Sequence, residues 1–254
     1  SQHNTHHAIP NMLERDRDTH DGDPDIDTLP VLAWSRYFAE KAARLGGMVP
    51  FLVKYQSWMM FPALLMARLA WVDQSFRWVL GAEMGWGVKG RTVPLRYPLL
   101  ELPLLLSHYV WYALMAWQGG FSIAQFLVHF AVANALGGFF IGVAFIVGHN
   151  GMDIVASSQR PAFFKWQVAT TRNVDDDPIG FTGWFTGGLG YQIEHHLYPS
   201  LPRHSLPLAK PFVQALCKKH NIPYHSTSLP TGLVEVLQCL DKVSLDFIAE
   251  FPAM

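Results

Sequence analysis

The chain has 254 residues, which is long enough to bury a sizeable core in one large domain or two small ones. Apolar residues make up 50% of it and charged residues only 15%, whereas soluble domains carry about 25%, so the composition argues against an ordinary soluble protein. The net charge of −1 gives no reason to expect a nucleic-acid partner, and two cysteines are too few for a disulfide framework, which indicates a reducing environment.

A histidine cluster opens the chain. In His3-Asn4-Thr5-His6-His7 the histidines lie three and four residues apart, spacings that place side chains on one face of a helix. Imidazole is the commonest metal ligand in proteins, so the pattern predicts a metal site. The chain starts with Ser1 inside this cluster, with no signal peptide before it, and we therefore expect an N-terminal part to be missing.

An acidic stretch follows from Asp21 to Asp27, with the sequence DGDPDID. Its alternating acids are similar to those of a calcium loop, but Ile26 stands where that loop needs glycine and Leu32 stands where it needs a closing glutamate. We therefore expect a turn here, or a cap for the helix that follows, and no calcium site.

The first apolar stretch runs from Trp58 to Val72. Pro62 interrupts it and Arg68 lies within it, while tryptophans near both ends suit the headgroup level of a bilayer. These features favour an interfacial or re-entrant helix over residues 58–72 rather than a full span.

Two longer apolar runs cover residues 98–117 and 124–148. The first contains one acidic residue, Glu101, and the second contains none. A helix needs about 20 residues to cross about 30 Å of hydrocarbon, so both runs predict transmembrane helices. Within the second, Gly138 and Gly142 form a GxxxG pair, which either permits close helix packing or reflects the abundance of glycine in membrane helices.

The charges around these two runs predict their orientation. The connector over residues 118–123 is uncharged, and basic residues collect outside the pair: Arg77, Lys89, Arg91, Arg96, Arg160, Lys165 and Arg172. Under the positive-inside rule both flanks are cytoplasmic, so the two runs form a two-span hairpin. The segments before and after the hairpin then lie on the same side of the membrane and can meet.

A second cluster, Gln192-Ile193-Glu194-His195-His196, repeats the spacing of the first with glutamine in the leading position. The two clusters together offer five histidines, more than the four ligands of one structural zinc site, which suggests two metal ions. A histidine-rich pair of metals beside a membrane suggests iron and dioxygen chemistry, although imidazole also suits zinc, copper and nickel.

These motifs carry a family resemblance. HNTHH and QIEHH resemble the second and third histidine boxes of the membrane fatty acid desaturases, and a glutamine leads the third box in their front-end group. The surrounding HNTHHAIPN, GDPDIDTLPVLAWS, GHNGM, TTRNV, WFTGGLGYQIEHHLYPSLPRH and CKKHNIPYH agree, so the resemblance covers nearly the whole chain. The family's first box, His-Asp-x-Gly-His, and the His-Pro-Gly-Gly haem motif of a cytochrome b5 domain do not occur in this sequence. Residues 1–254 are thus expected to be a partial desaturase domain.

The resemblance implies a ligand set for iron. Its members are His3, His6, His7, His149, Gln192, His195 and His196. Gln192 stands where other desaturases have histidine, so it is expected to ligate weakly or through water. For His149 the alternative is a hydrogen bond to a backbone carbonyl at the helix end. Asn150 and His204 are expected to support the ligands from outside.

The resemblance also implies fold and function. It predicts an all-α integral membrane protein, with the transmembrane hairpin below a cytoplasmic helical cap that holds two iron ions. The expected reaction is oxygen-dependent insertion of a cis double bond on the carboxyl side of an existing one in a polyunsaturated acyl chain.

The substrate would be an acyl-CoA or an acyl lipid, and electrons would come from a cytochrome b5 domain or protein and its reductase. The expected location is the endoplasmic reticulum membrane, with the histidine boxes facing the cytosol. Alternatives are a sphingolipid long-chain-base desaturase, a di-iron lipid hydroxylase, a zinc membrane hydrolase, or a protein without activity. This partial domain alone is expected to be inactive.

Overall fold

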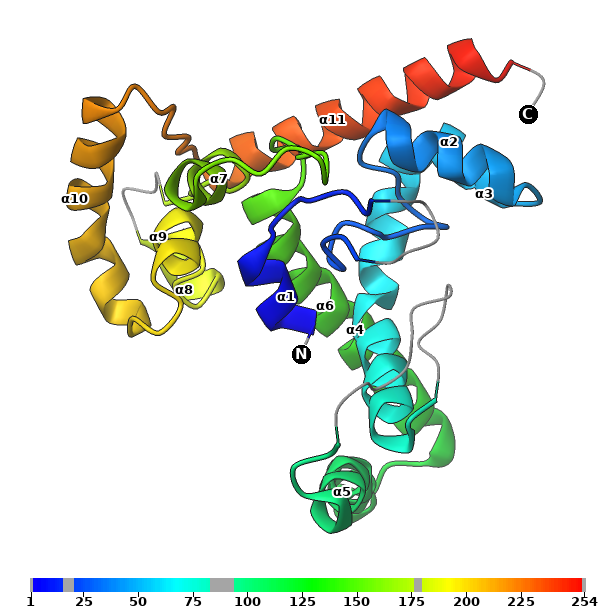
Figure 1. Cartoon of the computed structure of the whole chain (residues 1–254). Coiled ribbons are helices and arrows are strands. Elements are labelled where there is room, and N and C mark those ends of the chain that lie inside the picture. The colour runs from blue at the N-terminus through cyan, green and yellow to red at the C-terminus, as the bar shows by residue number, and fades with distance from the viewer. Residues whose placement is uncertain (1, 16–20, 83–93, 176–179, 253–254) are drawn as a thin grey trace. The chain divides into compact units, whose positions relative to one another are not determined.

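The computed structural model describes residues 2–15, 21–82, 94–175 and 180–252. These residues form helices, and among them the structure contains no strand beyond two isolated bridges, which confirms the predicted all-α class. The helices, shown in Figure 1, are α1 (Gln2–Ala8), α2 (Arg36–Leu45), α3 (Val49–Lys54), α4 (Gln56–Leu80), α5 (Pro98–Gln118), α6 (Ile123–His149), α7 (Phe163–Ala169), α8 (Phe181–Phe185), α9 (Gln192–Leu197), η1 (Arg203–Ser205), α10 (Leu206–Lys219) and α11 (Leu229–Glu250).

The chain divides into two compact units. Unit 1 contains Ser1–Met60 and Val143–Met254, and unit 2 contains Phe61–Gly142. The divisions fall inside α4 and α6, so each of these helices contributes residues to both units.

In unit 1, α11 packs against α2 and α3 (Figure 1). The side chains that α11 buries here are Val236, Leu240, Val243 and Phe247, which recur at the spacing of one helix face. The Ser244 hydroxyl donates to the Val53 carbonyl at 3.0 Å, which joins α11 to α3. Apolar burial and this polar contact together hold α2, α3 and α11 against one another.

A second apolar cluster in unit 1 holds α9 in place. It consists of Val168 from α7, Ile193 and Leu197 from α9, and Val213 and Cys217 from α10. α9 is only six residues long and would not persist alone, because short helices are marginal in water. Its position therefore depends on burial between α7 and α10.

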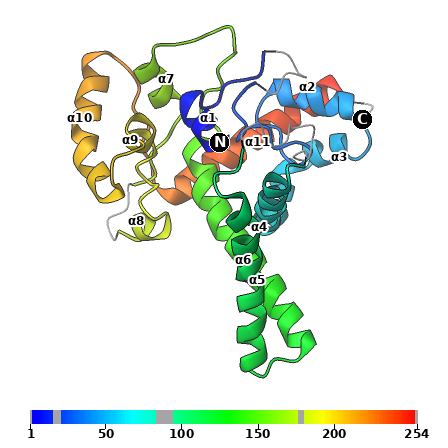
Figure 2. The ribbon, with the colours of Figure 1, turned by 60° about the horizontal axis from the view of Figure 1, so that its bottom comes forward.

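Unit 2 contains α5 and the larger part of α6, the two helices predicted to span a membrane. The predicted runs over residues 98–117 and 124–148 correspond to α5 and α6, each within one residue at both ends. Figure 2 shows α5 and the first part of α6 joined by the short connection over residues 119–122. The Tyr112 ring packs against Phe126 and Phe130, at centroid distances of 5.6 and 5.8 Å, and the Tyr112 hydroxyl pairs with His129 Nδ1.

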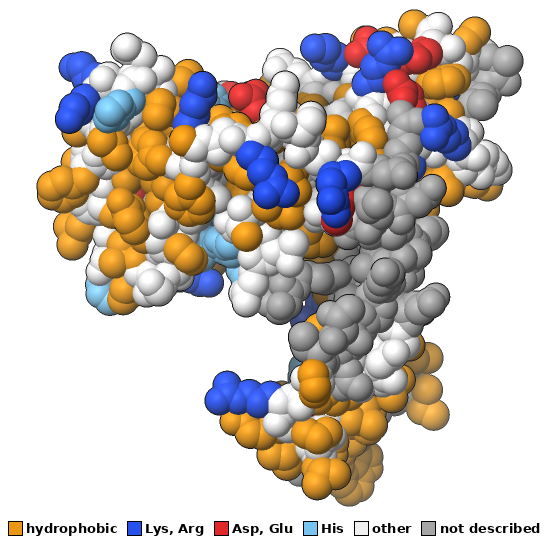
Figure 3. Space-filling model, viewed as in Figure 1, with side chains coloured by type: hydrophobic (Ala, Val, Ile, Leu, Met, Phe, Trp, Pro, Cys, Tyr) orange, Lys and Arg blue, Asp and Glu red, His pale blue; other side chains and the backbone are white. Residues whose placement is uncertain are grey.

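The outer surface of α5 is strongly apolar. None of its side chains is buried, and Leu99 is 86% exposed. Hydrophobic side chains cover the face of α5 seen in Figure 3. Among the described residues, α5 and α6 are the helices long and apolar enough to cross a bilayer. Contiguous apolar surface of this kind marks a protein or lipid contact.

The apolar stretch at residues 58–72 lies in a longer helix than predicted. α4 runs unbroken for 25 residues with Pro62 inside it, and it packs closely on α6. A Cβ added to Gly138 would lie 2.9 Å from both the backbone nitrogen of Arg68 and the carbonyl oxygen of Leu64. Close approach of the two backbones therefore requires glycine at position 138, which supports the packing explanation of the GxxxG pair.

Arg68 connects all three helices of unit 2. Its Nε donates to Asn134 Oδ1 on α6 at 3.0 Å, and its Nη2 lies 3.4 Å from His108 Nε2 on α5. These contacts provide hydrogen-bond partners for the Arg68 guanidinium, whose charge would otherwise be energetically unfavourable within an apolar helix.

One of the flanking basic residues lies in the interior of the protein. Arg172 is fully buried in unit 1, where Nε donates to the Val147 carbonyl and Nη2 to the Asn150 carbonyl, both at 2.8 Å, while Nη1 pairs with Glu235. It holds the C-terminal end of α6 and is not a surface charge. Lys89 and Arg91 lie outside the described residues.

Candidate metal centre

Three elements of unit 1 carry the predicted ligands. α1 contributes His3, His6 and His7, the last residue of α6 is His149, and α9 carries the second cluster. Asn11 fixes α1 against the end of α6, because its Nδ2 donates to the carbonyl oxygens of His149 and Asp153, both at 3.1 Å. Its backbone has a φ of 53°, a left-handed conformation that asparagine tolerates better than most residues.

The carboxylate of Glu194 anchors α9. It is fully buried and accepts hydrogen bonds from Asn173 Nδ2 and the Tyr224 hydroxyl, both at 2.8 Å. The amide oxygen of Asn173 accepts from the Ile193 nitrogen at 2.9 Å, so one side chain also satisfies a free donor at the start of the helix. The orientation of the two histidines that follow is set by this contact.

The first group of histidines consists of His6, His149 and His196. One ring nitrogen from each lies within 4.8 Å of the other two, and all three side chains are buried. His6 Nε2 and His149 Nε2 are 3.3 Å apart. His196 Nε2 is buried without a hydrogen-bond partner in a side chain that is only 1% exposed, which leaves a lone pair directed at no protein donor.

Each member of this buried triad is held by its other nitrogen. His6 Nδ1 donates to the Asp23 carboxylate at 2.9 Å, and His149 Nδ1 donates to the Thr170 carbonyl at 3.2 Å. His196 Nδ1 faces Gln167 Oε1 at 3.0 Å. Because these acceptors take the Nδ1 proton, Nε2 is the nitrogen with which each ring could bind a metal, although His149 Nε2 lies 2.8 Å from the amide nitrogen of Gln192.

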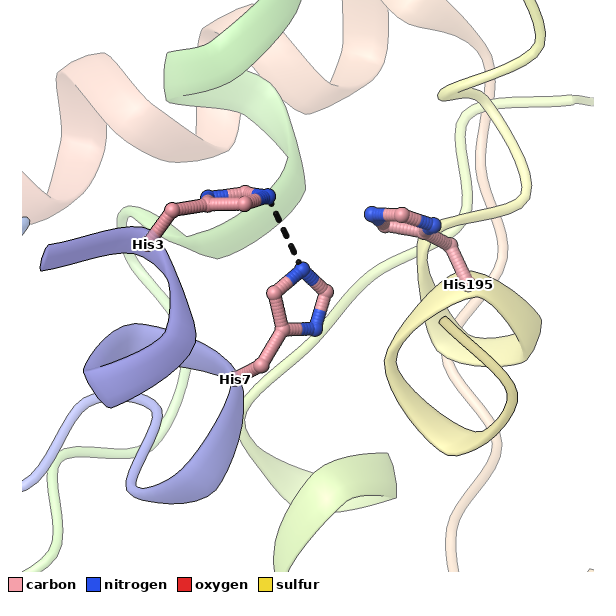
Figure 4. Close-up of side chains that lie close together, drawn as sticks. All are labelled: His3, His7 and His195. Atoms are coloured by element: carbon pink, nitrogen blue, oxygen red, sulfur yellow. Dashed lines mark hydrogen bonds between the residues drawn. The ribbon is translucent and has the colours of Figure 1, made fainter. Parts of the chain in front are cut away.

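The second group consists of His3, His7 and His195. Their nearest ring nitrogens also lie within 4.8 Å of one another. Figure 4 shows His3 and His7 on α1 facing His195 on α9, with His3 Nε2 and His7 Nε2 3.1 Å apart. This exposed triad is more open than the first, since His3 is exposed and the other two are partly buried.

The two triads are adjacent. The His7 ring stacks on the His196 ring at a centroid distance of 4.3 Å, and His195 and His196 follow one another in α9. The structure thus brings all six predicted histidine ligands into one cluster, divided into two sets of three.

Burial and mutual proximity change the proton affinity of these rings. Burial, followed by the nearby histidines, lowers the pKa of His7 to about 4. The pKa of His195 also falls to about 4, by burial and then by nearby charges, and burial takes the pKa of His196 well below its usual range. Burial alone would lower the pKa of His6, but the hydrogen bond and charge of Asp23 outweigh it and raise the pKa. At neutral pH the lowered rings are neutral, which is the form that binds metal.

The remaining predicted residues divide into those near the cluster and those away from it. The Gln192 amide nitrogen lies 2.8 Å from His149 Nε2, so this side chain faces the buried triad. Asn150 lies at the end of α6, where its backbone carbonyl accepts from Arg172. His204 is exposed on η1. For His149 the structure shows a hydrogen bond from Nδ1 to a backbone carbonyl, while Nε2 faces the triad, so this hydrogen bond is compatible with the predicted role as a ligand.

Two buried residues at the cluster were not predicted as parts of a metal site. Asp23 belongs to the acidic stretch that was expected only to form a turn, and it does accept from the Asp25 nitrogen at 2.9 Å as a turn residue does. Gln167 lies in α7, in a segment without a recognised motif. Their spacing from the histidines in the sequence does not predict either role, because Asp23 and Gln167 contact His6 and His196 through the tertiary structure.

The donor set fits a pair of transition-metal ions. Each triad presents imidazole nitrogens alone, which suit iron, zinc, copper and nickel better than magnesium or calcium. The unpartnered Nε2 of His196 gives this fit a structural basis, because a buried acceptor without a donor is costly. The residues that would hold the two ions are the buried and the exposed triads.

Comparison with known proteins gives the family. The fatty acid desaturase family model matches residues 1–228. The chain is 35% identical over 249 residues to an acyl-lipid (9-3)-desaturase of Physcomitrium patens, a match that covers 96% of this chain and 43% of that protein. It is 32% identical to a Delta(8)-fatty-acid desaturase of Euglena gracilis, covering 94% of this chain and 54% of the relative. It is also 32% identical to the Delta(6)-fatty-acid desaturase fat-3 of Caenorhabditis elegans, covering 96% and 52%.

The chain therefore spans about half the length of the curated relatives that it matches. No solved structure matches it. Because the family model covers most of the chain and agrees with the histidine motifs, the chain belongs to the fatty acid desaturase family.

Proposed function

We propose that the protein containing this chain is a front-end desaturase that inserts a cis double bond into a polyunsaturated fatty acyl chain. The observation that carries the proposal is the meeting of two histidine triads, each with its ring nitrogens within 4.8 Å. Two adjacent metal positions with donors of one kind suit a reaction in which dioxygen accepts four electrons. Two of these come from the acyl chain and two from an external electron donor.

Two bound iron ions would supply, with dioxygen, two electrons and two protons, the oxidising power to remove one hydrogen from each of two adjacent methylenes, and dioxygen would be reduced to two waters. The chain's own residues hold and orient the donors. Asp23, Thr170 and Gln167 fix the ring orientation of the buried triad, and the buried surroundings of His196 exclude water from it. Methylenes offer nothing to hydrogen-bond, so the position of the new bond must follow from how far the acyl chain enters.

The partners follow from this reaction. The electrons would come from cytochrome b5, as a fused domain or as a separate protein with its reductase. The substrate is proposed to be an acyl-CoA or an acyl lipid, and the relatives include both a Delta(8) and a Delta(6) fatty-acid desaturase, whose names give different carbons for the double bond. The carbon attacked in this protein is left to experiment.

The membrane arrangement is part of the proposal. The histidines of α1 and α9 flank the apolar helices in sequence and yet meet in unit 1, so an even number of membrane crossings separates them. α6 is proposed to be one crossing helix. The apolar composition of α5 favours α5 as its partner, with α4 interfacial, whereas the glycine packing of Gly138 favours α4. In both arrangements the histidines face the cytosol, from the endoplasmic reticulum membrane.

The test is expression of the complete protein in yeast fed with polyunsaturated fatty acids, followed by gas chromatography–mass spectrometry of the total fatty acids. A new double bond on the carboxyl side of an existing one is expected, and the spectrum gives its position. His195→Ala should abolish the product with the protein still in the membrane, whereas His220→Ala, at an exposed position after α10, should keep it. Hydroxylated products, or desaturated sphingoid bases with unchanged fatty acids, would replace this proposal by one of the alternatives.

Metal exchange separates the redox proposal from a hydrolase. Removing iron should abolish desaturation, ferrous iron should restore it, and zinc should not, because zinc has no redox chemistry. Restoration by zinc would contradict the proposed reaction.

A further inference from the structure

Asp23 is a buried carboxylate that no predicted ligand set includes. Its side chain is fully enclosed, and both of its oxygens lie close to His6 Nδ1, at 2.9 and 3.0 Å. The Asn11 nitrogen donates to Asp23 Oδ2 at 2.6 Å and the Asp25 nitrogen donates to Oδ1 at 2.9 Å. Three donors thus converge on one carboxylate, which holds it in place as an anion acceptor.

The loop around Asp23 is shaped to bring this carboxylate to α1. The Asp23 nitrogen donates to the Met12 carbonyl at 2.8 Å. A Cβ on Gly22 would lie 2.6 Å from the Glu14 nitrogen and 2.7 Å from the Met12 oxygen, so only glycine permits the two backbones to pass this closely. The acidic stretch therefore has a defined place beside the buried triad.

The two triads differ in the charge around them. In the buried triad, His149 and His196 are held by a neutral carbonyl and a neutral amide, and His6 is held by the Asp23 anion. In the exposed triad, His7 Nδ1 has no hydrogen-bond partner. In the part of the chain that the structure describes, no carboxylate forms a hydrogen bond or ion pair with a ring of His3, His7 or His195, and the charge of Asp25 acts on His3 only at longer range.

We propose that Asp23 is a positioning residue that makes the two metal positions unequal, with the position at His6, His149 and His196 binding its metal more tightly. This inference rests on the proposed function, in which both triads hold iron. A carboxylate that accepts the Nδ1 proton fixes the ring and increases the basicity of Nε2, and loss of such a partner typically costs about 10–100-fold in metal affinity. Asp23 acts through His6 and does not touch the metal.

An alternative geometry exists for the same residues. His6, Asp23 and Asp25 also have ligand atoms within 4.8 Å of one another, so the two carboxylates could bind a cation directly. Asp25 is exposed and its carboxylate lies 3.6 Å from His6 Nδ1, compared with 2.9 Å for Asp23. A positioning role predicts unequal effects of the two aspartates, whereas a shared cation predicts equal effects.

The experiment is anaerobic titration of the complete, metal-free protein in detergent with ferrous iron. Wild type should bind two irons per chain with two affinities, and Mössbauer spectra of the ⁵⁷Fe-loaded protein should show two distinct doublets. Asp23→Asn should weaken one of the two binding steps about 10–100-fold and keep the other, while Asp25→Asn should resemble wild type. Retention of the second iron shows that the variant is folded.

Each other outcome overturns a defined statement. Absence of iron binding by wild type would contradict the proposed function itself. Two irons in wild type with an unchanged titration of Asp23→Asn would overturn only the role of Asp23, as would a single doublet for both irons. Equal losses in the Asp23→Asn and Asp25→Asn proteins would indicate direct coordination, and loss of both irons from Asp23→Asn would show that its effect is not confined to one position.

Discussion

Gln167 and His196 make a contact that joins the two histidine clusters. Gln167 Oε1 accepts from His196 Nδ1 at 3.0 Å, and the same amide donates through Nε2 to the His7 carbonyl oxygen at 3.0 Å. One buried side chain thereby fixes a ring of α9 and the backbone of α1. The arrangement of the two triads therefore depends on α7, a helix that contributes no histidine to either triad.

We expect Gln167→Leu to weaken iron binding about 10–100-fold, because His196 loses its acceptor and the His7 carbonyl its donor. Gln167→Glu keeps an acceptor for His196 and loses only the donor, so its effect should be smaller. Iron per chain after dialysis against a chelator measures both variants. Equal iron retention by Gln167→Leu and wild type would show that the amide does not orient the ligand.

Two neighbouring glycines of α6 provide a matched pair for helix packing. A Cβ at Gly138 would lie 2.9 Å from backbone atoms of α4, which cannot give way, whereas a Cβ at Gly137 would meet only Arg68 Cδ at 3.4 Å. Gly138→Ala should therefore destabilise the protein by about 1–3 kcal/mol, as overpacking does. Gly137→Ala should be neutral or slightly stabilising, since alanine favours helix. Thermal unfolding in detergent compares them, and similar midpoints would contradict close packing of α4 on α6.

A cysteine at Gly81, just after α4, discriminates the two membrane arrangements. If α4 and α6 are the crossing pair, Gly81→Cys lies on the far side and should resist a membrane-impermeant maleimide added to the cytosolic side. If α5 and α6 are the pair, the same cysteine should react. Gly120→Cys, in the connection between α5 and α6, should be protected in both cases and serves as the control. Labelling of Gly120→Cys in sealed vesicles would contradict both arrangements.

The metal-free protein should lose stability as the pH falls from about 7 to about 4. An unfolded histidine has a pKa of about 6.5, whereas the pKa values of folded His7 and His195 are about 4 and that of His196 is well below its usual range. Below pH 6.5 the unfolded chain therefore binds protons that the folded chain does not. The raised pKa values of His6, Asp25 and Glu194 act in the opposite direction, but their shifts are smaller than those of His7 and His195, and the lowered pKa of Glu235 adds to the loss of stability.

Unfolding midpoints of the metal-free protein in detergent at about pH 7.5, 6 and 4.5 test this pH dependence. His195→Gln should make the stability less dependent on pH, because at most one proton fewer is taken up on unfolding. A midpoint that stays constant over this range would contradict the lowered pKa values.

Local patterns in the sequence were sufficient to predict α5 and α6 and the helical spacing of the histidines in α1 and α9, but they do not predict the other helices of unit 1. The spacing of three and four residues in α1 is a property of one helix turn, so it predicts that His3, His6 and His7 share a face. It does not predict that His6 joins one triad while His3 and His7 join the other. That division follows from packing of α1 against α6 and α9, which involves residues more than 140 positions away, such as His149 opposite His6 at a sequence separation of 143.

The same reason explains the residues that were missed. Asp23 was compared with a calcium loop, a pattern defined by spacing along the chain, whereas its partner His6 lies 17 residues earlier. Arg172 flanks the second apolar run as predicted, but position in the sequence does not reveal that it is buried. The sequence predicts a helix over residues 58–72 only, because Pro62 and Arg68 disfavour a longer apolar helix, and composition does not reveal that Arg68 contacts Asn134 and His108.

The last turn of α6 ends against a guanidinium that another segment supplies. Arg172 binds the carbonyls of Val147 and Asn150, and Glu235 of α11 binds Arg172 in turn. His149 therefore takes its position from unit 1, although its helix begins in unit 2. We therefore expect substitutions in the first part of α6, from Ile123 to Gly142, to leave the donor nitrogen of His149 in place, whereas substitutions at Arg172 or Glu235 should displace it.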